Sequence, residues 1–178
     1  MSKNSGGHRR GPPSDWIQRF VGEIKPGGSI LDLACGSGRH SLFLLRRGHP
    51  VTACDIDVSG LADIKREAGL EIIQADLENT PWPFPERLFS AIVVTNYLHR
   101  PLFPHILSAL APQGLLLYET FAAGNERFGR PKNPDYLLHR GELLSSIFAG
   151  LTIIAYEDLT IKEPYPAALQ RLCARKST

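Results

Sequence analysis

The stretch ILDLACGSGRH, residues 30–40, decides the fold because an apolar run passes directly into a turn with two glycines. Residues 29–33 are mostly apolar and are bounded by glycines, which predicts a short buried strand. Gly36 and Gly38 permit a tight backbone turn and a close approach of a ligand. The next residues, 40–47, predict a helix that ends at Gly48. A strand, a glycine turn and a helix in this order are typical of the ligand-binding edge of an α/β sheet.

The remainder of the chain repeats this alternation of short apolar strands and helices. Ahead of the glycine turn, Ser14 and Asp15 are suitable caps for an N-terminal helix. Residues 122–140 contain Gly, Asn and Pro throughout and are predicted to form a long loop. The other predicted helices cover residues 58–68, 102–110 and 141–149, and the other strands cover 51–54, 70–74, 89–95, 115–120, 151–156 and 167–174.

This order of elements predicts a doubly wound, mostly parallel, seven-stranded sheet with helices on both faces, a Rossmann-like three-layer α/β sandwich. Only a turn with Pro164 and Pro166 separates the last two strands, so they are expected to be antiparallel neighbours. Residues 1–13 are rich in Gly, Ser, Pro and charge and are predicted to be a disordered tail. Residues 14–178 are expected to form a single domain.

Composition places few limits on function. The chain has 178 residues, 43% apolar and 21% charged, with a formal net charge of +2, which gives no argument for a nucleic-acid or membrane partner. No stretch approaches the roughly 18 apolar residues that span a bilayer, and the N-terminus lacks the apolar segment of a signal peptide. We therefore expect a cytoplasmic protein. The three cysteines have no metal-type spacing and are expected to be reduced, buried thiols, so no metal site is predicted.

Polar side chains follow most of the predicted strands. Asp32, Asp55, Asp76, Asn96 and Glu119 each lie at or just beyond a strand end. In a parallel sheet these ends meet at one edge, where ligands bind. An aspartate at a strand end is often only a helix cap or a solvated turn, so no single one of them defines a site.

The glycine turn itself distinguishes two kinds of ligand. A dinucleotide site requires the spacing G-x-G-x-x-G, but here the three positions are Ala34, Gly36 and Arg39. Asp32 stands two residues before the first of these positions and favours a ligand with a cationic amine over one with two phosphates. A nicotinamide-dependent oxidoreductase is therefore a minor alternative, supported only by the spacing of Gly36 and Asp55.

The segment LDLACGSG resembles the cofactor loop of the seven-stranded class I S-adenosylmethionine-dependent methyltransferases, with Ala34 in place of their most frequent glycine. The resemblance covers residues 30–121. It implies that Asp32 faces the methionine amino group, Asp55 the ribose hydroxyls, and Asp76 and Leu77 the adenine. The cofactor-binding residues implied in this way are Asp32, Leu33, Ala34, Gly36, Gly38, Asp55, Ile56, Asp76, Leu77 and Asn96. The cofactor would be S-adenosyl-L-methionine and the product S-adenosyl-L-homocysteine.

Few residues could act on the methyl acceptor. The candidates for the transfer pocket are Asn96 and Tyr97 after the fourth strand, His99 slightly further on, and Glu119 in the fifth. Tyr118 and Glu119 are neighbours near the end of one strand, so they are expected to face opposite sides of the sheet. His99 fits a surface turn equally well.

The loop 122–140 carries Arg127, Arg130, Lys132, His139 and Arg140, and it leaves the fifth strand at the ligand edge. It could be an anion-attracting lid over a small acidic acceptor or simply a solvated loop. Residues 133–156 loosely resemble the tellurite-resistance methyltransferases, which suggests a small-molecule substrate. The alternatives are a protein or RNA methyltransferase that needs a partner and a non-catalytic S-adenosylmethionine-binding module. A nucleic-acid partner is not expected, and the oligomeric state is left open.

Overall fold

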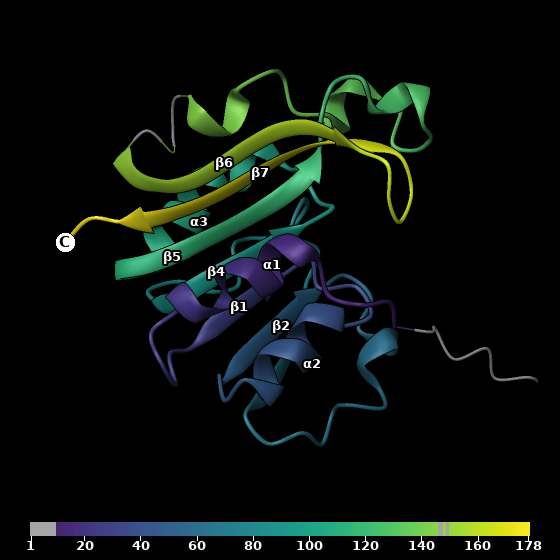
Figure 1. Cartoon of the computed structure of the whole chain (residues 1–178). Helices are drawn as coiled ribbons and strands as arrows, with labels where there is room; N and C mark the ends of the chain where they lie inside the picture. Colours follow the sequence, from purple (N-terminus) through teal and green to yellow (C-terminus); the bar gives the residue numbers. More distant parts are fainter. Residues whose placement is uncertain (1–9, 146–147, 149) are drawn as a thin grey trace, which may run out of the picture.

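The computed structural model describes residues 10–145, 148 and 150–178, and the described residues form one seven-stranded sheet (Figure 1). The strand order is β3-β2-β1-β4-β5-β7-β6. The first five strands are parallel, β7 is antiparallel to both of its neighbours, and the predicted antiparallel pairing of the last two strands is confirmed. The strand bounds are β1 Ile30–Leu33, β2 Val51–Asp55, β3 Leu70–Gln74, β4 Phe89–Thr95, β5 Leu110–Phe121, β6 Leu151–Ile161 and β7 Ala167–Lys176.

Helices cover both faces of the sheet. The helices α1, Asp15–Phe20, and α2, Arg39–Arg46, lie on the near face in Figure 1, and α3, Phe103–Ala109, lies behind the sheet. Ser14 caps α1, since its hydroxyl accepts a hydrogen bond from the Trp16 amide. The predicted three-layer α/β fold is confirmed.

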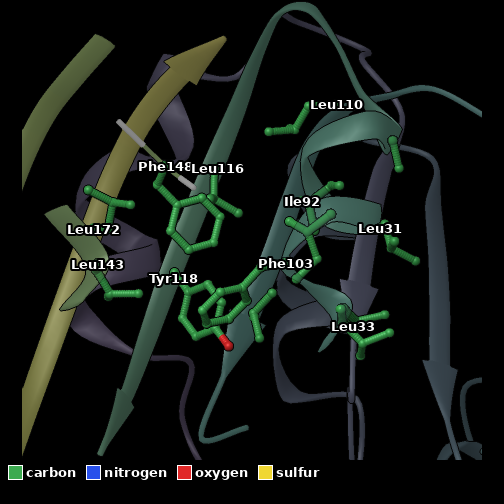
Figure 2. Close-up of a cluster of buried hydrophobic side chains, with 14 of the residues drawn as sticks. Leu31, Leu33, Ile92, Phe103, Leu110, Leu116, Tyr118, Leu143, Phe148 and Leu172 are labelled. Carbon is green, nitrogen blue, oxygen red and sulfur yellow. The ribbon is translucent and has the colours of Figure 1, made fainter. Parts of the chain in front are cut away.

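Two apolar clusters fill the spaces between the layers. On the α1 side, Trp16, Ile17 and Phe20 pack on the sheet residues Val93 and Leu117. On the α3 side, the cluster in Figure 2 joins Phe103 to Tyr118 and Phe148, with Leu31, Ile92 and Leu116 from the strands. Successive residues of a strand alternate between the two clusters, so each central strand is buried on both faces. This rigid core fixes the positions of the strand ends.

The helix predictions at residues 58–68 and 141–149 were wrong in the described part of the chain. The first region contains only the 3-10 turn Ser59–Leu61 followed by further turns. The second contains the 3-10 turn Glu142–Leu144, and residues 146, 147 and 149 lie outside the described residues. In the first segment only Leu61 and Ile64 are buried, and among the described residues of the second only Leu143 and Phe148 are buried, so the apolar stripe that supports a longer helix is missing.

Several element boundaries also differ from the prediction, most of all those of the last three strands. The strand β5 begins at Leu110 instead of residue 115, and β6 and β7 extend to Ile161 and Lys176 because they pair with each other along most of their length. Within the predicted tail 1–13, Arg10 forms an ion pair with Asp63, and residues 1–9 are outside the described part, so the disorder of the tail stays a prediction.

Within the described residues, no helix has the length and apolar character needed to cross a membrane. Cys35, Cys54 and Cys173 are free and buried, as predicted.

Candidate functional site

Strand register brings the predicted site residues to one edge of the sheet. Leu33, the last residue of β1, pairs with Cys54 of β2 and Val94 of β4. The residues that follow these three positions are Ala34, Asp55 and Thr95, so the glycine turn lies between the ends of β2 and β4. The end of β3 lies beside Asp55, and Thr95 pairs with Glu119 of β5.

The glycine turn has an unusual backbone. Ala34, Gly36 and Gly38 all have positive φ angles, of 53°, 55° and 73°. A Cβ atom added at Gly36 would meet no described atom within 4 Å, because this glycine faces an open cavity. A Cβ atom at Gly38 would collide with the side chain of Leu61. Gly36 therefore leaves space for a ligand, whereas Gly38 permits close packing of the turn on the segment after β2.

Asp32 is buried beneath the turn, and only one of its two carboxylate oxygens forms a hydrogen bond with a described residue. Its Oδ2 atom accepts a hydrogen bond of 2.5 Å from Ser41, and its Oδ1 atom has no partner among the described residues. Burial raises the pKa of Asp32 to about 6, although Ser41 and Arg39 oppose the shift. A buried carboxylate oxygen without a partner is unfavourable, and a cationic amine near it would remove the penalty. This fits the methionine amino group that the sequence resemblance assigned to Asp32.

Asp55 connects the glycine turn to the second strand. Its Oδ2 atom accepts a hydrogen bond of 2.7 Å from the Gly36 amide, and its Oδ1 atom accepts one of 3.0 Å from the Asp57 amide. Each carboxylate oxygen has a further lone pair, so the pair can still accept the two hydroxyls of a ribose. Asp55 thus positions the turn and remains available to a ligand.

Asp76 acts as a turn cap. Its carboxylate accepts hydrogen bonds from the Glu78 and Asn79 amides and from the Asn79 side chain, and these bonds lower its pKa. With Asp55, Asp76 lines a cavity of about 300 Å³. The other residues lining that cavity are Ala34, Ile56, Ala75, Leu77, Glu78, Asn79 and Tyr97. Its apolar side chains and edge carboxylates suit a nucleoside.

A second cavity of about 380 Å³ lies on the other side of Ala34. It is lined by Gly11, Gly36, Arg39, Thr95 and Asn96, among others. The N-terminal segment borders this cavity because Arg10 is fixed there: its Nε atom donates to the Ser37 carbonyl at 2.6 Å, and its guanidinium forms an ion pair of 2.7 Å with Asp63. Together the two cavities form one elongated site with Ala34 at the junction, as required for a nucleoside attached to an amino acid.

A third cavity of about 200 Å³ meets both of these. It shares Asn96 with the second cavity and shares Glu78 and Tyr97 with the first. Its remaining lining residues are Leu98, Thr120, Phe121, Pro131 and Tyr136. A ligand there would lie next to the junction of the elongated site, so this is the candidate acceptor pocket.

Only two of the four predicted catalytic residues lie at the acceptor pocket in the described structure. Asn96 and Tyr97 line the acceptor pocket, whereas in the described structure His99 and Glu119 line none of the three cavities. Glu119 is buried in an ion pair with Arg171, with 2.6 Å between Oε2 and Nε. Its neighbour Tyr118 faces the opposite side of the sheet, where its hydroxyl donates to the Tyr97 carbonyl at 2.9 Å. Tyr118 therefore supports the pocket without entering it.

Sequence reasoning missed Glu78, Pro131 and Tyr136 in the acceptor pocket, whereas residues 119–121, which include Phe121, were among the predicted ligand-edge positions. Glu78 follows Asp76 and Leu77 directly, so its place in the motif was a usable signal. Pro131 and Tyr136 come from the long loop, and no local pattern shows which loop residues fold back onto the site.

The loop 122–140 is fastened to the domain at several points. Arg100 forms an ion pair with Glu142 and donates to the carbonyls of Asp135 and Leu137. The buried Asn125 accepts from the Ala168 amide and donates to the Pro131 carbonyl. These contacts hold the loop against the domain in this structure, where it forms one wall of the acceptor pocket.

The sheet order and the comparisons with known proteins together support a class I S-adenosylmethionine-dependent methyltransferase domain, with S-adenosylmethionine as its cofactor. Residues 30–114 match a family of proteins described as methyltransferase domains. This matched range contains the glycine turn, Asp55 and Asp76, which confirms the main family resemblance found in the sequence.

Individual relatives are more distant. Malonyl-[acyl-carrier protein] O-methyltransferase from Serratia marcescens is 32% identical over 121 residues, 61% of this chain and 47% of the relative. The chain spans about half the length of the curated relatives that it matches. TehB from Haemophilus influenzae has a similar fold, with a TM-score of 0.73, 19% identity, and coverage of 92% of this chain and 62% of TehB. The looser of the two family resemblances, that of residues 133–156 to the tellurite-resistance methyltransferases, therefore holds at the level of the fold.

A second solved structure with a similar fold is the 1,6-didemethyltoxoflavin-N1-methyltransferase from Burkholderia thailandensis, with bound 1,6-didemethyltoxoflavin and S-adenosylhomocysteine. It gives a TM-score of 0.68 at 17% identity and covers 92% of this chain and 77% of that enzyme.

Proposed function

We propose that this protein transfers a methyl group from S-adenosylmethionine to a small anionic molecule bound in the third cavity. The observation that carries the proposal is the arrangement of the cavities, since the third meets the elongated cofactor site at its junction through Asn96, Tyr97 and Glu78. This pocket has a volume of about 200 Å³, which suits a small acceptor.

The anionic part of the proposal rests on the neighbouring loop. Arg130 and Lys132 line an open groove that shares Pro131 and Tyr136 with the acceptor pocket. Neither cation forms an ion pair with another described residue. Two cations at the mouth attract an anion and raise its local concentration. Arg127, on the same loop, lines neither this groove nor the pocket in the described structure.

The chain's own residues would bind and orient the two reactants. When bound, S-adenosylmethionine supplies an electrophilic methyl group. Asp32 would hold the amino group, and Asp55 the ribose hydroxyls. Asn96 and Tyr97 would then form the boundary between cofactor and acceptor. Holding the reacting atoms in line and excluding water contributes a large part of the acceleration in such reactions.

The curated relative that acts on a malonyl group carried by acyl-carrier protein is consistent with an anionic acceptor. We further propose a cytoplasmic location, because three free, buried thiols suit a reducing compartment.

The test uses S-adenosylmethionine with an isotopically labelled methyl group, added with the protein to a cell extract. The extract is then separated into protein, RNA and small molecules, and the small molecules are separated by charge. Label in small anions is expected. Label in protein or RNA would favour the partner-dependent alternative, and cofactor binding without transfer to any fraction would favour a non-catalytic module.

A further inference from the structure

The acceptor pocket and the groove beside it form a passage with charges of opposite sign at its two ends. At the outer end lie Arg130 and Lys132, next to the shared residues Pro131 and Tyr136. At the inner end lies Glu78, which lines both the acceptor pocket and the nucleoside cavity. The passage therefore runs from two cations to one carboxylate beside the cofactor.

The middle of the passage is lined by flat side chains. Tyr97, Phe121, Pro131 and Tyr136 surround a volume of about 200 Å³. For comparison, an engineered protein cavity of about 150 Å³ holds one benzene molecule. The pocket thus has room for a single substituted ring. Aromatic walls also favour a planar ligand, because offset and edge-to-face ring contacts are stabilising.

Glu78 restricts the kind of nucleophile that can approach the cofactor. Its backbone amide donates to Asp76, which fixes the start of the side chain at the wall between the two cavities. A carboxylate there repels an anionic nucleophile and can accept the proton of a hydroxyl or amino group. Burial, and to a smaller extent the adjacent Glu78 carboxylate, raises the pKa of Tyr97, so this phenol stays protonated and cannot be the proton acceptor.

We propose that the acceptor is a planar, single-ring anion that binds by its anionic group at Arg130 and Lys132 and presents a protonated hydroxyl or amino nucleophile to Glu78. This inference rests on the proposed function. The nucleophile forms a bond to the methyl carbon, the carbon–sulfur bond breaks with its electron pair left on sulfur, and the proton passes to the Glu78 carboxylate. The anionic group then serves only to bind the acceptor, and a different atom receives the methyl group.

Three probes that differ only in the nucleophile test this inference: 4-hydroxybenzoate, 4-aminobenzoate and benzoate. Their affinities for the 178-residue protein saturated with S-adenosylhomocysteine are measured by calorimetry. At least one of the first two should bind about fivefold or more tightly than benzoate, because only they can donate a hydrogen bond to Glu78. Equal affinities, or no binding of any probe to the saturated protein, would overturn the inference.

Variants at the two ends of the passage test the roles of Glu78 and Arg130 separately. Glu78→Ala, which removes the hydrogen-bond acceptor, should abolish the preference over benzoate, whereas Glu67→Ala, at another exposed glutamate outside the described cavities, should preserve it. Arg130→Ala should weaken all three probes alike. A preference that survives in Glu78→Ala would remove Glu78 from the site.

The position of the transferred methyl group is a second readout. Mass spectrometry should find it on the phenolic oxygen or the amine, and a methyl ester of the carboxylate would contradict the role of Glu78 while leaving the proposed function intact. Failure of S-adenosylhomocysteine itself to bind would instead refute the proposed function, so the two failures are distinguishable.

Discussion

The cofactor half and the acceptor half of the site are built in different ways. The cofactor half uses side chains at the ends of neighbouring parallel strands, such as Asp32 and Asp55, whose positions follow from the register of a buried sheet. The acceptor half uses Pro131 and Tyr136 from the loop 122–140, which contacts of Arg100 with Asp135 and of Asn125 with Ala168 hold in place over long sequence distances. Strand register fixes cofactor binding, whereas individual loop contacts determine the acceptor.

The largest effect should come from Asp55→Ala, which acts only on the cofactor half. It removes the acceptor for two ribose hydroxyls and the partner of the Gly36 amide, so affinity for S-adenosylmethionine should fall by about tenfold to a hundredfold. Asp57→Ala is the matched control, because Asp57 lies two residues further on and does not line the nucleoside cavity in the described structure. Calorimetry measures both, and an unchanged affinity in Asp55→Ala would remove Asp55 from the site.

The second prediction concerns pH. The amine of the cofactor favours ionised Asp32, so affinity should weaken as pH falls below about 6, by up to about tenfold per pH unit. The folding stability of the free protein depends on pH in the opposite direction to the cofactor affinity. The raised pKa means that the folded protein holds the proton more tightly than the unfolded chain, so this stability contribution declines as pH rises from 3.8 to about 6. Asp32→Asn should flatten both profiles, and a pH-dependent affinity that persists in this variant would contradict the assignment.

A smaller effect is expected in the acceptor half. The double variant Arg130→Ala, Lys132→Ala should lower kcat/KM for an anionic acceptor by about five- to tenfold at low salt, and by less at high salt. Cofactor affinity should not change, because neither residue lines the cofactor cavities in the described structure. Arg127→Ala, which removes one positive charge from the same loop, should leave kcat/KM within about twofold. Loss of cofactor binding in the double variant would show that the loop is only structural.

The smallest effect should come from His99→Ala. His99 lines none of the three cavities in the described structure, so kcat and KM should change by less than about twofold. A loss of about a hundredfold in kcat, as general acid–base catalysis would give, would restore His99 as a catalytic residue.

The sequence was most informative where local rules apply. The strand-end aspartates and the glycine turn could be placed because a parallel sheet aligns its carboxyl ends. The pairing of Glu119 with Arg171 could not be foreseen, because it joins strands 52 residues apart through an antiparallel register. The helix predicted at 58–68 failed for a related reason: helical spacing was present, but tertiary packing buries only Leu61 and Ile64 in that segment.

Calorimetric titration with S-adenosylmethionine, S-adenosylhomocysteine and NAD in parallel tests the central claim most directly. The buried, half-satisfied Asp32 and the elongated cavity on both sides of Ala34 predict micromolar binding of the two sulfur nucleosides and no binding of NAD. No binding of either sulfur nucleoside would contradict the account, and the glycine turn would then be only a tight connection in an α/β core.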